Sequence, residues 1–327
     1  MKLTDATAQF LSHCRYERNL SVHTVRAYGS DLREFAAYSD RNGRSDLAAI
    51  STEHIRGYLT WLLESGRLAA TSVRRRAATL RAFFSWIEDQ NLLDDSPLRR
   101  LRINIRIPKS LPRHLSRKMM TRLRGVFAKS AGLEPGQAYR AQKVPPLPSR
   151  MQRTDLTLLV AVEVLIATGV RVSELTSLTL EALNLEDGTA RVHGKGSRER
   201  EVFLLDPDVR ELLRQYIQRR HLWALNTSAL LINSRGDRAS PQFIRKHLHS
   251  GAQRAGLNQR ATPHMLRHSC ATFLLERGVD LRFVQSLLGH SSVATTERYT
   301  HVTKFSLKRA LQRAIGRPWQ IAETDDN

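Results

Sequence analysis

Residues 262–300 read TPHMLRHSCATFLLERGVDLRFVQSLLGHSSVATTERYT and place several polar side chains beside helix-forming runs. Thr262 is a typical helix N-cap, and Pro263 suits the first helical position, where no amide donor is needed. His264 and Arg267 follow three residues apart, a spacing that puts both side chains on one face of a helix. We therefore predict a helix that begins here and presents a histidine and an arginine together.

Two further helices are predicted in the same stretch. Gly278 is typical of a left-handed stop at the end of the first helix. The next helix covers Leu281–Leu288 and ends at Gly289, which leaves His290 on the turn. A third helix then carries Tyr299 near its end. This order of polar groups at helix ends and faces indicates a cluster gathered around one ligand.

Composition narrows the class of ligand. The chain has 327 residues, 41% of them hydrophobic, and a formal net charge of +21, so it is a folded protein with a strong attraction for polyanions. Nucleic acid is the leading candidate and an anionic membrane surface the competitor, although no apolar run reaches the roughly 18–20 residues that span a bilayer. The N-terminus lacks the apolar run of a signal peptide.

Only Cys14 and Cys270 occur, which favours neither a disulfide framework nor a cysteine zinc site. We expect a cytoplasmic, nucleoid-associated protein that binds no membrane.

Residues 1–100 are predicted to form a helical domain. Apolar side chains recur at helical spacing in VHTVRAYGSDLREFAAYS, residues 22–39. Thr52 and Thr71 are suited to start two further helices, so we expect a bundle of about four helices. The run Arg74–Arg76 allows two interpretations, an ordinary solvated face or a set of contacts to phosphates.

Residues 101–153 are predicted to be a basic linker or insert. From residue 97 to residue 153 the chain holds 15 Lys or Arg residues and one acid, Glu134, and six prolines from residue 108 onward interrupt it. Such a composition is typical of a linker. It either lies along a phosphate backbone or is a disordered solubilising segment. A short helix over Ser116–Lys129 is expected to begin the second domain.

Residues 154–327 are predicted to form the second domain. The apolar run Leu156–Ala167 is long enough for a buried helix, and Arg171 and Glu174 follow it at a spacing that allows them to pair. The sequence TARVH-GKGS-REREVFLL then indicates a β-hairpin with Lys195 at its tip. A third apolar run, Ala229–Ile232, is a candidate for a further strand. The fold class is mainly α with a small β-hairpin or sheet.

The candidate functional side chains describe one kind of chemistry. Arginines match the non-bridging oxygens of a phosphate, a lysine on a hairpin can donate a proton, and a tyrosine hydroxyl near cations is a nucleophile. Together they indicate phosphoryl transfer through a covalent phosphotyrosine, with fixed cations in place of a metal. A metal pair at His264 and His268 is disfavoured because HMLRH has Met where a zincin carries Glu. His268 remains open between support of the site and core packing. The candidate catalytic residues are Arg171, Lys195, His264, Arg267, His290 and Tyr299.

The strings TGVRVSEL, GKGSRER, HMLRHSCAT and LLGHSSVATTERYTHV resemble those of the tyrosine recombinase family, which includes phage integrases and Xer-type recombinases. The segments NLSVHTVRAYGSDLREF and TSVRRRAATLRAFFSWI resemble that family's helical core-binding domain. The resemblance covers residues 5 to 315. It implies the tyrosine recombinase fold, with a core-binding SAM-like DNA-binding domain over residues 1–100 and a catalytic domain over residues 154–327.

The resemblance also implies a role for each candidate. Arg171 and Arg267 bind the scissile phosphate, and Lys195 protonates the leaving 5′ oxygen. His264 is a base or proton relay, and His290 donates to a phosphate oxygen. Tyr299 attacks and forms a 3′-phosphotyrosine. The implied function is site-specific DNA recombination or integration without metal, ATP or another cofactor, consistent with the lack of a G-x-x-x-x-G-K-[ST] loop.

The implied partners are double-stranded DNA recombination sites and further recombinase subunits. The family implies a tetramer on DNA, with the free protein a monomer or the partner a related recombinase, and accessory directionality factors in some systems. The tail KFSLKRALQRAIGRPWQ has helical spacing but lacks the His-Pro-Arg ending expected of Xer-type proteins. Chromosome-dimer resolution and movement of a phage, transposon or other mobile element all remain open. A type IB-like topoisomerase and a non-catalytic DNA-binding accessory protein are the alternatives.

Overall fold

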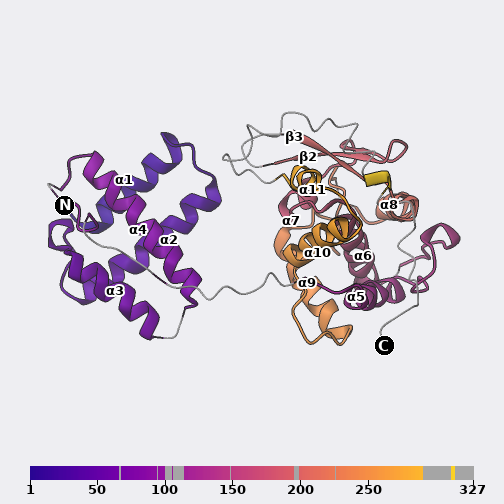
Figure 1. Cartoon of the computed structure of the whole chain (residues 1–327), viewed down its shortest axis with the longest axis horizontal. Coiled ribbons are helices and arrows are strands. Elements are labelled where there is room, and N and C mark those ends of the chain that lie inside the picture. Colours follow the sequence, from indigo (N-terminus) through magenta and orange to yellow (C-terminus); the bar gives the residue numbers. More distant parts are fainter. Residues whose placement is uncertain are drawn as a thin grey trace. The chain divides into compact units, whose positions relative to one another are not determined.

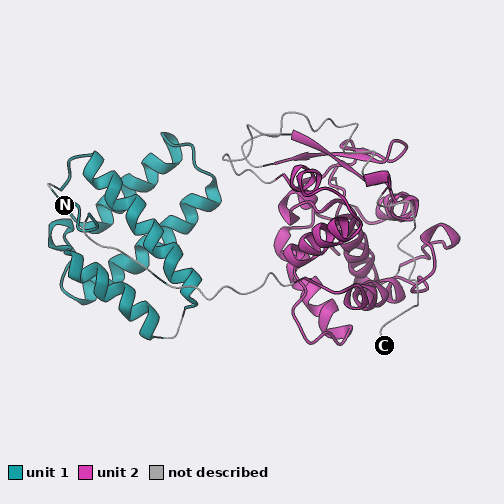
Figure 2. Ribbon diagram, viewed as in Figure 1, with its two compact units in different colours: residues 1–110 teal, residues 111–327 magenta. Residues whose placement is uncertain are grey.

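The computed structural model describes residues 1–65, 68–93, 95–99, 105, 114–147, 149–194, 199–224, 226–289 and 311–313. The chain divides into two compact units, residues 1–110 and residues 111–327 (Figure 2). The predicted fold class is confirmed, since the described residues are mostly helical with one small antiparallel sheet. Within those ranges, helices with enough length and apolar character to cross a bilayer are absent.

The described residues of the first unit form four α-helices (Figure 1), as predicted. They are α1 (Leu3–Tyr16), α2 (Val22–Arg41), α3 (Thr52–Glu64) and α4 (Ala70–Asp89). Their apolar faces share one core, in which the rings of Phe35 and Phe84 meet edge to face. Aromatic pairs of this geometry add specific attraction to the burial of their area.

Serine side chains cap the starts of α2 and α3. The Ser21 hydroxyl accepts from the Thr24 amide at 3.2 Å, and the Ser51 hydroxyl accepts from the His54 amide at 3.2 Å. The sequence favours Thr52 as the cap of α3, but Thr52 is the first helical residue and the cap is Ser51. Both hydroxyl residues are good caps, and the Thr52 hydroxyl instead donates to the carbonyl of Pro97 at 2.7 Å.

Two arginines of the basic run on α4 are paired with acids on α2. Arg75 and Thr79 both donate to the buried carboxylate of Asp31, the latter at 2.8 Å. Arg76 forms an ion pair with Glu34 at 2.6 Å. A buried carboxylate needs such donors, so these two arginines hold α2 and α4 together. The run is therefore not a uniformly solvated face.

The second unit is built around α6 (Arg150–Thr168). This helix is buried on all sides over most of its length, as its nearly continuous apolar sequence predicts. Each fully buried leucine in it contributes roughly 1.5–3 kcal/mol, as an upper estimate. The helices packed against it are α5 (Arg117–Ser130), α7 (Val172–Ser177), α8 (Pro207–Arg220), α9 (Pro241–Arg254) and α10 (Pro263–Glu276), and α11 (Leu281–Leu288) packs against α10 (Figure 1).

The sheet of this unit has three antiparallel strands in the order β1 (Leu183–Asn184), β2 (Thr189–His193) and β3 (Glu199–Phe203). The predicted hairpin is present as β2 and β3. The third strand is β1, and the expectation of a strand at Ala229–Ile232 is wrong. That run forms only the isolated bridges of Ala229 with Thr179 and of Ile232 with Arg238, because its backbone pairs with two different short segments and continues along neither as a ladder.

From residue 114 to residue 147, the basic segment before α6 contributes to the second unit's core. The predicted short helix is present as α5, where Ser116 caps Met119 at 3.3 Å. Phe127 on α5 and Val144 beyond it are buried in the core shared with α6. These apolar side chains face inward, whereas charged ones such as Arg122 and Lys129 stay at the surface. Residues 114–147 thus fold against α6 and α8 instead of forming a free linker.

Gly251 provides a test of the packing between α9 and α5. A β-carbon at Gly251 would lie 2.2 Å from Cζ of the buried Phe127, so alanine forces the ring or the helix to move. Gly251→Ala is expected to destabilise the protein by about 1–3 kcal/mol in urea unfolding.

Gly125→Ala on α5 is the matched control. Its β-carbon would meet Pro135 at 3.5 Å, an ordinary contact. Alanine favours helix over glycine by up to about 1 kcal/mol, so this variant should be at least as stable as the parent. Equal effects of the two substitutions would contradict the close approach of α9 to Phe127.

Candidate active site

Helix α10 carries two of the candidate residues on adjacent turns. The Thr262 hydroxyl accepts from the Met265 amide at 3.2 Å, and Pro263 occupies the first turn, as predicted. His264 is exposed at this helix start, whereas Arg267 is buried. The helix therefore presents an accessible imidazole one turn before an enclosed guanidinium.

Helix α11 begins and ends as the sequence predicted. The Asp280 carboxylate accepts from the Arg282 amide at 2.7 Å, and Gly289 adopts a left-handed conformation with φ of 62°. Only a residue without a β-carbon adopts this φ at little cost, so the glycine ends the helix. The predicted positions of His290 and Tyr299 follow this point and lie outside the described residues.

Arg267 joins the ends of α6 and α11. Its two terminal nitrogens donate to the carbonyls of Gly169 and Leu288, each at 2.5 Å. The approach is close, since a β-carbon at Gly169 would lie 2.5 Å from the Leu288 side chain. Burial and, to a smaller extent, the neighbouring charge of Arg171 lower the pKa of Arg267 to about 10. The group still carries its full charge at neutral pH.

Arg171 caps α7 and pairs with Glu174, as the three-residue spacing predicted. Arg171 Nη1 donates to Glu174 Oε1 at 2.9 Å, and the Arg171 amide donates to Oε2 at 2.8 Å. Nη2 of the same guanidinium donates to the carbonyl of Gly289 at 2.9 Å. Arg171 and Arg267 thus converge, from different helices, on the last residues of α11.

Arg200 on β3 is a member of this cluster that the sequence reasoning missed. Its Nη1 donates to Glu174 Oε1 at 3.0 Å, and its Nη2 donates to Oε2 at 2.8 Å. The alternation of inward and outward side chains along the strand could have indicated its place in the site. Arg200 lies across from the buried Val192 and two residues before the buried Val202, so it points inward, where an arginine needs an acidic partner.

Three arginines bind three consecutive carbonyls at the end of α11. Arg200 Nε donates to Leu287 at 3.4 Å, and Arg267 and Arg171 donate to the next two residues. The last carbonyls of a helix have no partner within the helix, and the helix dipole favours positive charge there. The end of α11, directly before His290, is therefore fixed by the same guanidinium groups that form the cluster.

Glu174 is the acidic partner in the cluster. Its carboxylate is 3% exposed and accepts from two arginine side chains and one amide. Burial alone raises its pKa, but the hydrogen bonds and charge of Arg200 and Arg171 outweigh this effect and lower the pKa to about 2. The four side chains Arg171, Arg200, Arg267 and Glu174 carry a net charge of about +2 at neutral pH. Such a site is suited to an anion.

The structure describes three of the six predicted catalytic residues. Arg171 and Arg267 are brought together at the end of α11, and His264 lies one helical turn from Arg267. Lys195, at the predicted hairpin tip, lies outside the described residues, as His290 and Tyr299 do.

The other side of α10 receives the start of the second unit. The buried Ser269 hydroxyl accepts from the Leu115 amide at 2.9 Å and donates to the Leu115 carbonyl at 3.1 Å. His268 meets the ring of His114 edge to face, with centroids 6.2 Å apart. The sequence left His268 open between support of the site and core packing. In the structure its ring packs against the chain that enters the second unit.

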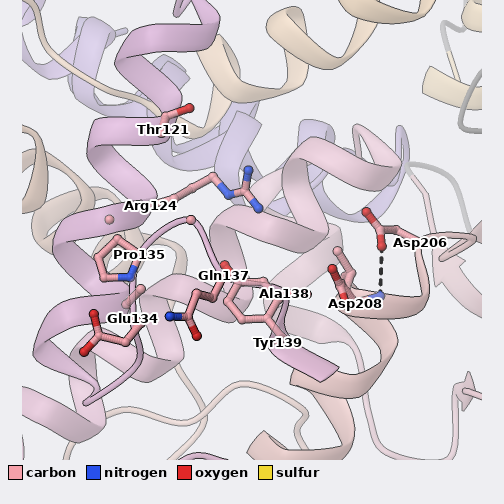
Figure 3. A pocket seen from close by; sticks show the side chains of 13 residues that line it. Thr121, Arg124, Glu134, Pro135, Gln137, Ala138, Tyr139, Asp206 and Asp208 are labelled. Carbon is pink, nitrogen blue, oxygen red and sulfur yellow. Dashed lines mark hydrogen bonds between the residues drawn. The ribbon is translucent and has the colours of Figure 1, made fainter. Parts of the chain in front are cut away.

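A separate pocket of about 80 Å³ lies between α5, the loop that follows it and the start of α8 (Figure 3). In its wall Arg124 Nε donates to Glu163 at 2.5 Å, and the Tyr139 hydroxyl donates to the same oxygen at 2.6 Å. Asp206 accepts from the Asp208 amide at its rim (Figure 3). Of the candidate catalytic residues, the three that the structure describes, Arg171, His264 and Arg267, do not line this pocket. The buried ion pair fastens residues 124–139 to α6.

Comparison with known proteins identifies the family. Residues 139–305 match the phage integrase family, and residues 7–91 match the N-terminal SAM-like domain of phage integrases. The chain belongs to the phage integrase family. Its relatives include the tyrosine recombinase XerC of Thermodesulfovibrio yellowstonii, 31% identical over 299 residues, with 90% of each chain covered.

A second relative of this recombinase is the tyrosine recombinase XerD of Listeria monocytogenes, 34% identical over 316 residues, with 94% of this chain and 97% of the relative covered. Among solved structures, a lambda integrase tetramer bound to a Holliday junction is 18% identical with a TM-score of 0.65, covering 91% of this chain and 77% of the other. That likeness concerns the fold. The family makes this chain a site-specific recombinase of the tyrosine class, as the motifs predicted, and favours neither the topoisomerase nor the accessory protein.

The lowered pKa of Glu174 makes the stability of the folded recombinase depend on pH in the acid range. Since the pKa in the folded state lies below the ordinary glutamate value of 4.5, ionised Glu174 stabilises the fold above that pH, and this stabilisation is lost as the pH falls toward 2. The stability difference between the parent and Glu174→Gln should therefore shrink by roughly 1 kcal/mol by pH 4 and roughly 2 kcal/mol by pH 3. Urea unfolding at pH 6, 4 and 3 measures it.

Glu186→Gln, on the exposed turn between β1 and β2, is the control for loss of one carboxylate. Solvent screens exposed charges, so its stability difference should change much less over the same range. A Glu174→Gln difference that stays constant between pH 6 and pH 3 would contradict the charge-assisted bonds to this carboxylate.

Proposed function

We propose that this recombinase cuts and rejoins duplex DNA at specific sites through a 3′-phosphotyrosine formed on Tyr299. The observation that carries the proposal is the convergence of Arg171 and Arg267 on the end of α11, directly before His290. In the sequence, Tyr299 follows nine residues later. Two fixed guanidinium groups and a nucleophile delivered by the next segment are what phosphoryl transfer needs.

Arg171 and Arg267 are proposed to bind the non-bridging oxygens of the scissile phosphate. Guanidinium groups match these oxygens in geometry and charge, and both are fixed before DNA arrives by bonds to protein carbonyls. Fixed donors stabilise the charge that develops on the phosphoryl group without reorganising during the reaction. Enclosure of Arg267 strengthens this interaction because little water screens it.

The proposed proton transfers use the remaining candidates. The Tyr299 oxygen attacks phosphorus and gives its proton to His264, which is exposed at the start of α10. The bond from phosphorus to the 5′ oxygen breaks, and that oxygen takes a proton from Lys195. His290 donates a hydrogen bond to a phosphate oxygen. The products of this step are a 3′-phosphotyrosine and a free 5′ hydroxyl.

Strand exchange is the reverse step with a different partner. The 5′ hydroxyl of another strand attacks the phosphotyrosine, restores a phosphodiester and releases Tyr299. One phosphate ester replaces another in each step, so no nucleotide hydrolysis is needed to drive the chemistry. We infer that the substrate is a pair of duplex sites, on a chromosome or a mobile element in the cytoplasm.

Domain roles and assembly follow the same proposal. Residues 1–100 are proposed to bind the core site, because this unit matches the SAM-like domain of phage integrases. The catalytic unit is proposed to act in a tetramer on DNA, as the lambda integrase of similar fold forms a tetramer on a Holliday junction. Exchange of strands between two sites requires subunits on both, and a closed assembly provides them.

Tyr299→Phe tests the nucleophile. The protein is incubated with a nicked suicide duplex of the site that it selects from a random DNA pool, and the covalent adduct is measured on a denaturing gel. Phenylalanine lacks the attacking oxygen, so the variant should form no adduct while its affinity for the duplex stays within about 3-fold, because many phosphate contacts carry binding.

Tyr16→Phe, at an exposed tyrosine of the first unit, is the matched control and should form the adduct at the parental level. An adduct that persists in Tyr299→Phe refutes the assignment of the nucleophile. Relaxation of supercoiled plasmids without regard to sequence would instead support a type IB-like topoisomerase.

Affinity for the DNA site should depend strongly on salt. Each phosphate that a basic side chain neutralises releases counterions, and a protein that contacts 6–10 phosphates loses roughly 10³–10⁵ in affinity between 50 and 200 mM salt. The net charge of +21 leads us to expect a steep slope in that range. Fluorescence anisotropy of a labelled site at several salt concentrations measures the slope, and an affinity independent of salt would exclude this mode of binding.

A further inference from the structure

Arg200 contacts two of the segments on which the proposed reaction depends. It lies on β3, five residues after Lys195 in the sequence, and its side chain reaches Glu174 on α7 and the carbonyl of Leu287 on α11. We propose that Arg200 is a positioning residue for strand cleavage, which fixes Glu174 and through it the guanidinium of Arg171. The proposal rests on the phosphate-binding role proposed above for Arg171.

The two oxygens of Glu174 are shared evenly between the two arginines. Oε1 accepts from the side chains of Arg171 and Arg200, and Oε2 accepts from the Arg171 amide and from the second terminal nitrogen of Arg200. The contact of Arg200 is therefore bidentate, which fixes the plane of the carboxylate. Since Arg171 bonds to the same oxygens, the orientation of its guanidinium depends on that plane.

Arg200 is itself held from two sides. The pairing of β3 with β2 sets its backbone opposite Val192, and its Nε donates to the carbonyl of Leu287 at 3.4 Å. A β-carbon at Gly289 would lie 3.3 Å from its Cζ, so the guanidinium lies directly against the end of α11. Fixed at these points, Arg200 can hold Glu174 without depending on Arg171.

Charge gives Arg200 a second effect on the same site. With Arg200, the four side chains carry three positive charges and one negative charge. Without it, Arg171 and Arg267 face the buried carboxylate alone, and Glu174 neutralises a larger share of the charge that Arg171 offers to a phosphate. A carboxylate that is 3% exposed acts in a weakly screened environment, so this competition is strong.

The effects of Arg200 on orientation and charge concern only the scissile phosphate, one of many phosphates in the bound DNA. DNA affinity is the sum of many contacts to the backbone, whereas cleavage depends on the geometry at the scissile phosphate. Loss of Arg200 should therefore reduce the cleavage step and leave binding nearly unchanged. A residue that only supported the overall fold would reduce stability, binding and cleavage together.

The test compares Arg200→Met, Arg200→Lys and the parent as full-length proteins on the nicked suicide duplex. Single-turnover adduct formation at saturating protein should fall roughly 10–100-fold in Arg200→Met, the range for residues that orient a functional group. The dissociation constant should change by less than about 3-fold. Arg200→Lys keeps the charge but loses the two-point contact, so its rate should lie between the two.

Arg191→Met on β2 is the matched control. Arg191 is exposed and pairs in register with Glu201, so it lies on the same hairpin but on the other face from Arg200. Its cleavage rate and affinity should match those of the parent. If Arg200→Met does not fold, as judged by circular dichroism and urea unfolding, the folded Arg200→Lys variant carries the test with an expected loss of several-fold.

A double-mutant comparison tests whether Arg200 affects cleavage through Glu174. If Arg200 acts through Glu174, combining Arg200→Met with Glu174→Gln should slow cleavage no more than the worse single variant does. Losses that multiply, or a parental rate in a folded Arg200 variant, overturn the proposal. If the parent itself forms no adduct, the proposed recombinase chemistry fails. Failure of the Arg200 proposal and failure of the proposed function therefore give different results.

Discussion

A buried carboxylate is the constraint on which the arrangement of the site depends. Glu174 has almost no access to water, and an isolated ion there would be strongly destabilising. The fold satisfies it with two guanidinium groups, Arg171 from the helix that Glu174 occupies and Arg200 from the sheet. The acid therefore joins three elements, α7, β3 and, through the arginines, the end of α11.

Much of the fold could be predicted because its signals are local. Helical spacing of apolar side chains, the Thr262–Pro263 start and the left-handed Gly289 each follow from neighbouring residues alone, and the structure has all of them. The pairing of Arg171 with Glu174 was also predictable, since three residues separate them on one helix start. Beyond these local signals, the order of the motifs along the sequence was the basis for the six candidate catalytic residues.

The features that the sequence did not predict involve partners that are distant along the chain. Arg200 lies 26 residues from Glu174, and no local pattern specifies that pairing. The run Ala229–Ile232 has strand-like composition, but its backbone partners are the distant residue Thr179 and the nearer Arg238, which give only isolated bridges. Likewise, residues 114–147 looked like a linker because charge and proline dominate the composition, while a few inward apolar side chains determine where they pack.

The double hydrogen bond of Ser269 with Leu115 has a mechanical consequence. A hydroxyl that both accepts from an amide and donates to a carbonyl of one residue fixes that backbone in two directions. The chain arriving from the first unit is thereby fastened to α10, half a turn of helix beyond Arg267. A load on the backbone at Leu115 therefore acts directly on α10, the helix that holds Arg267.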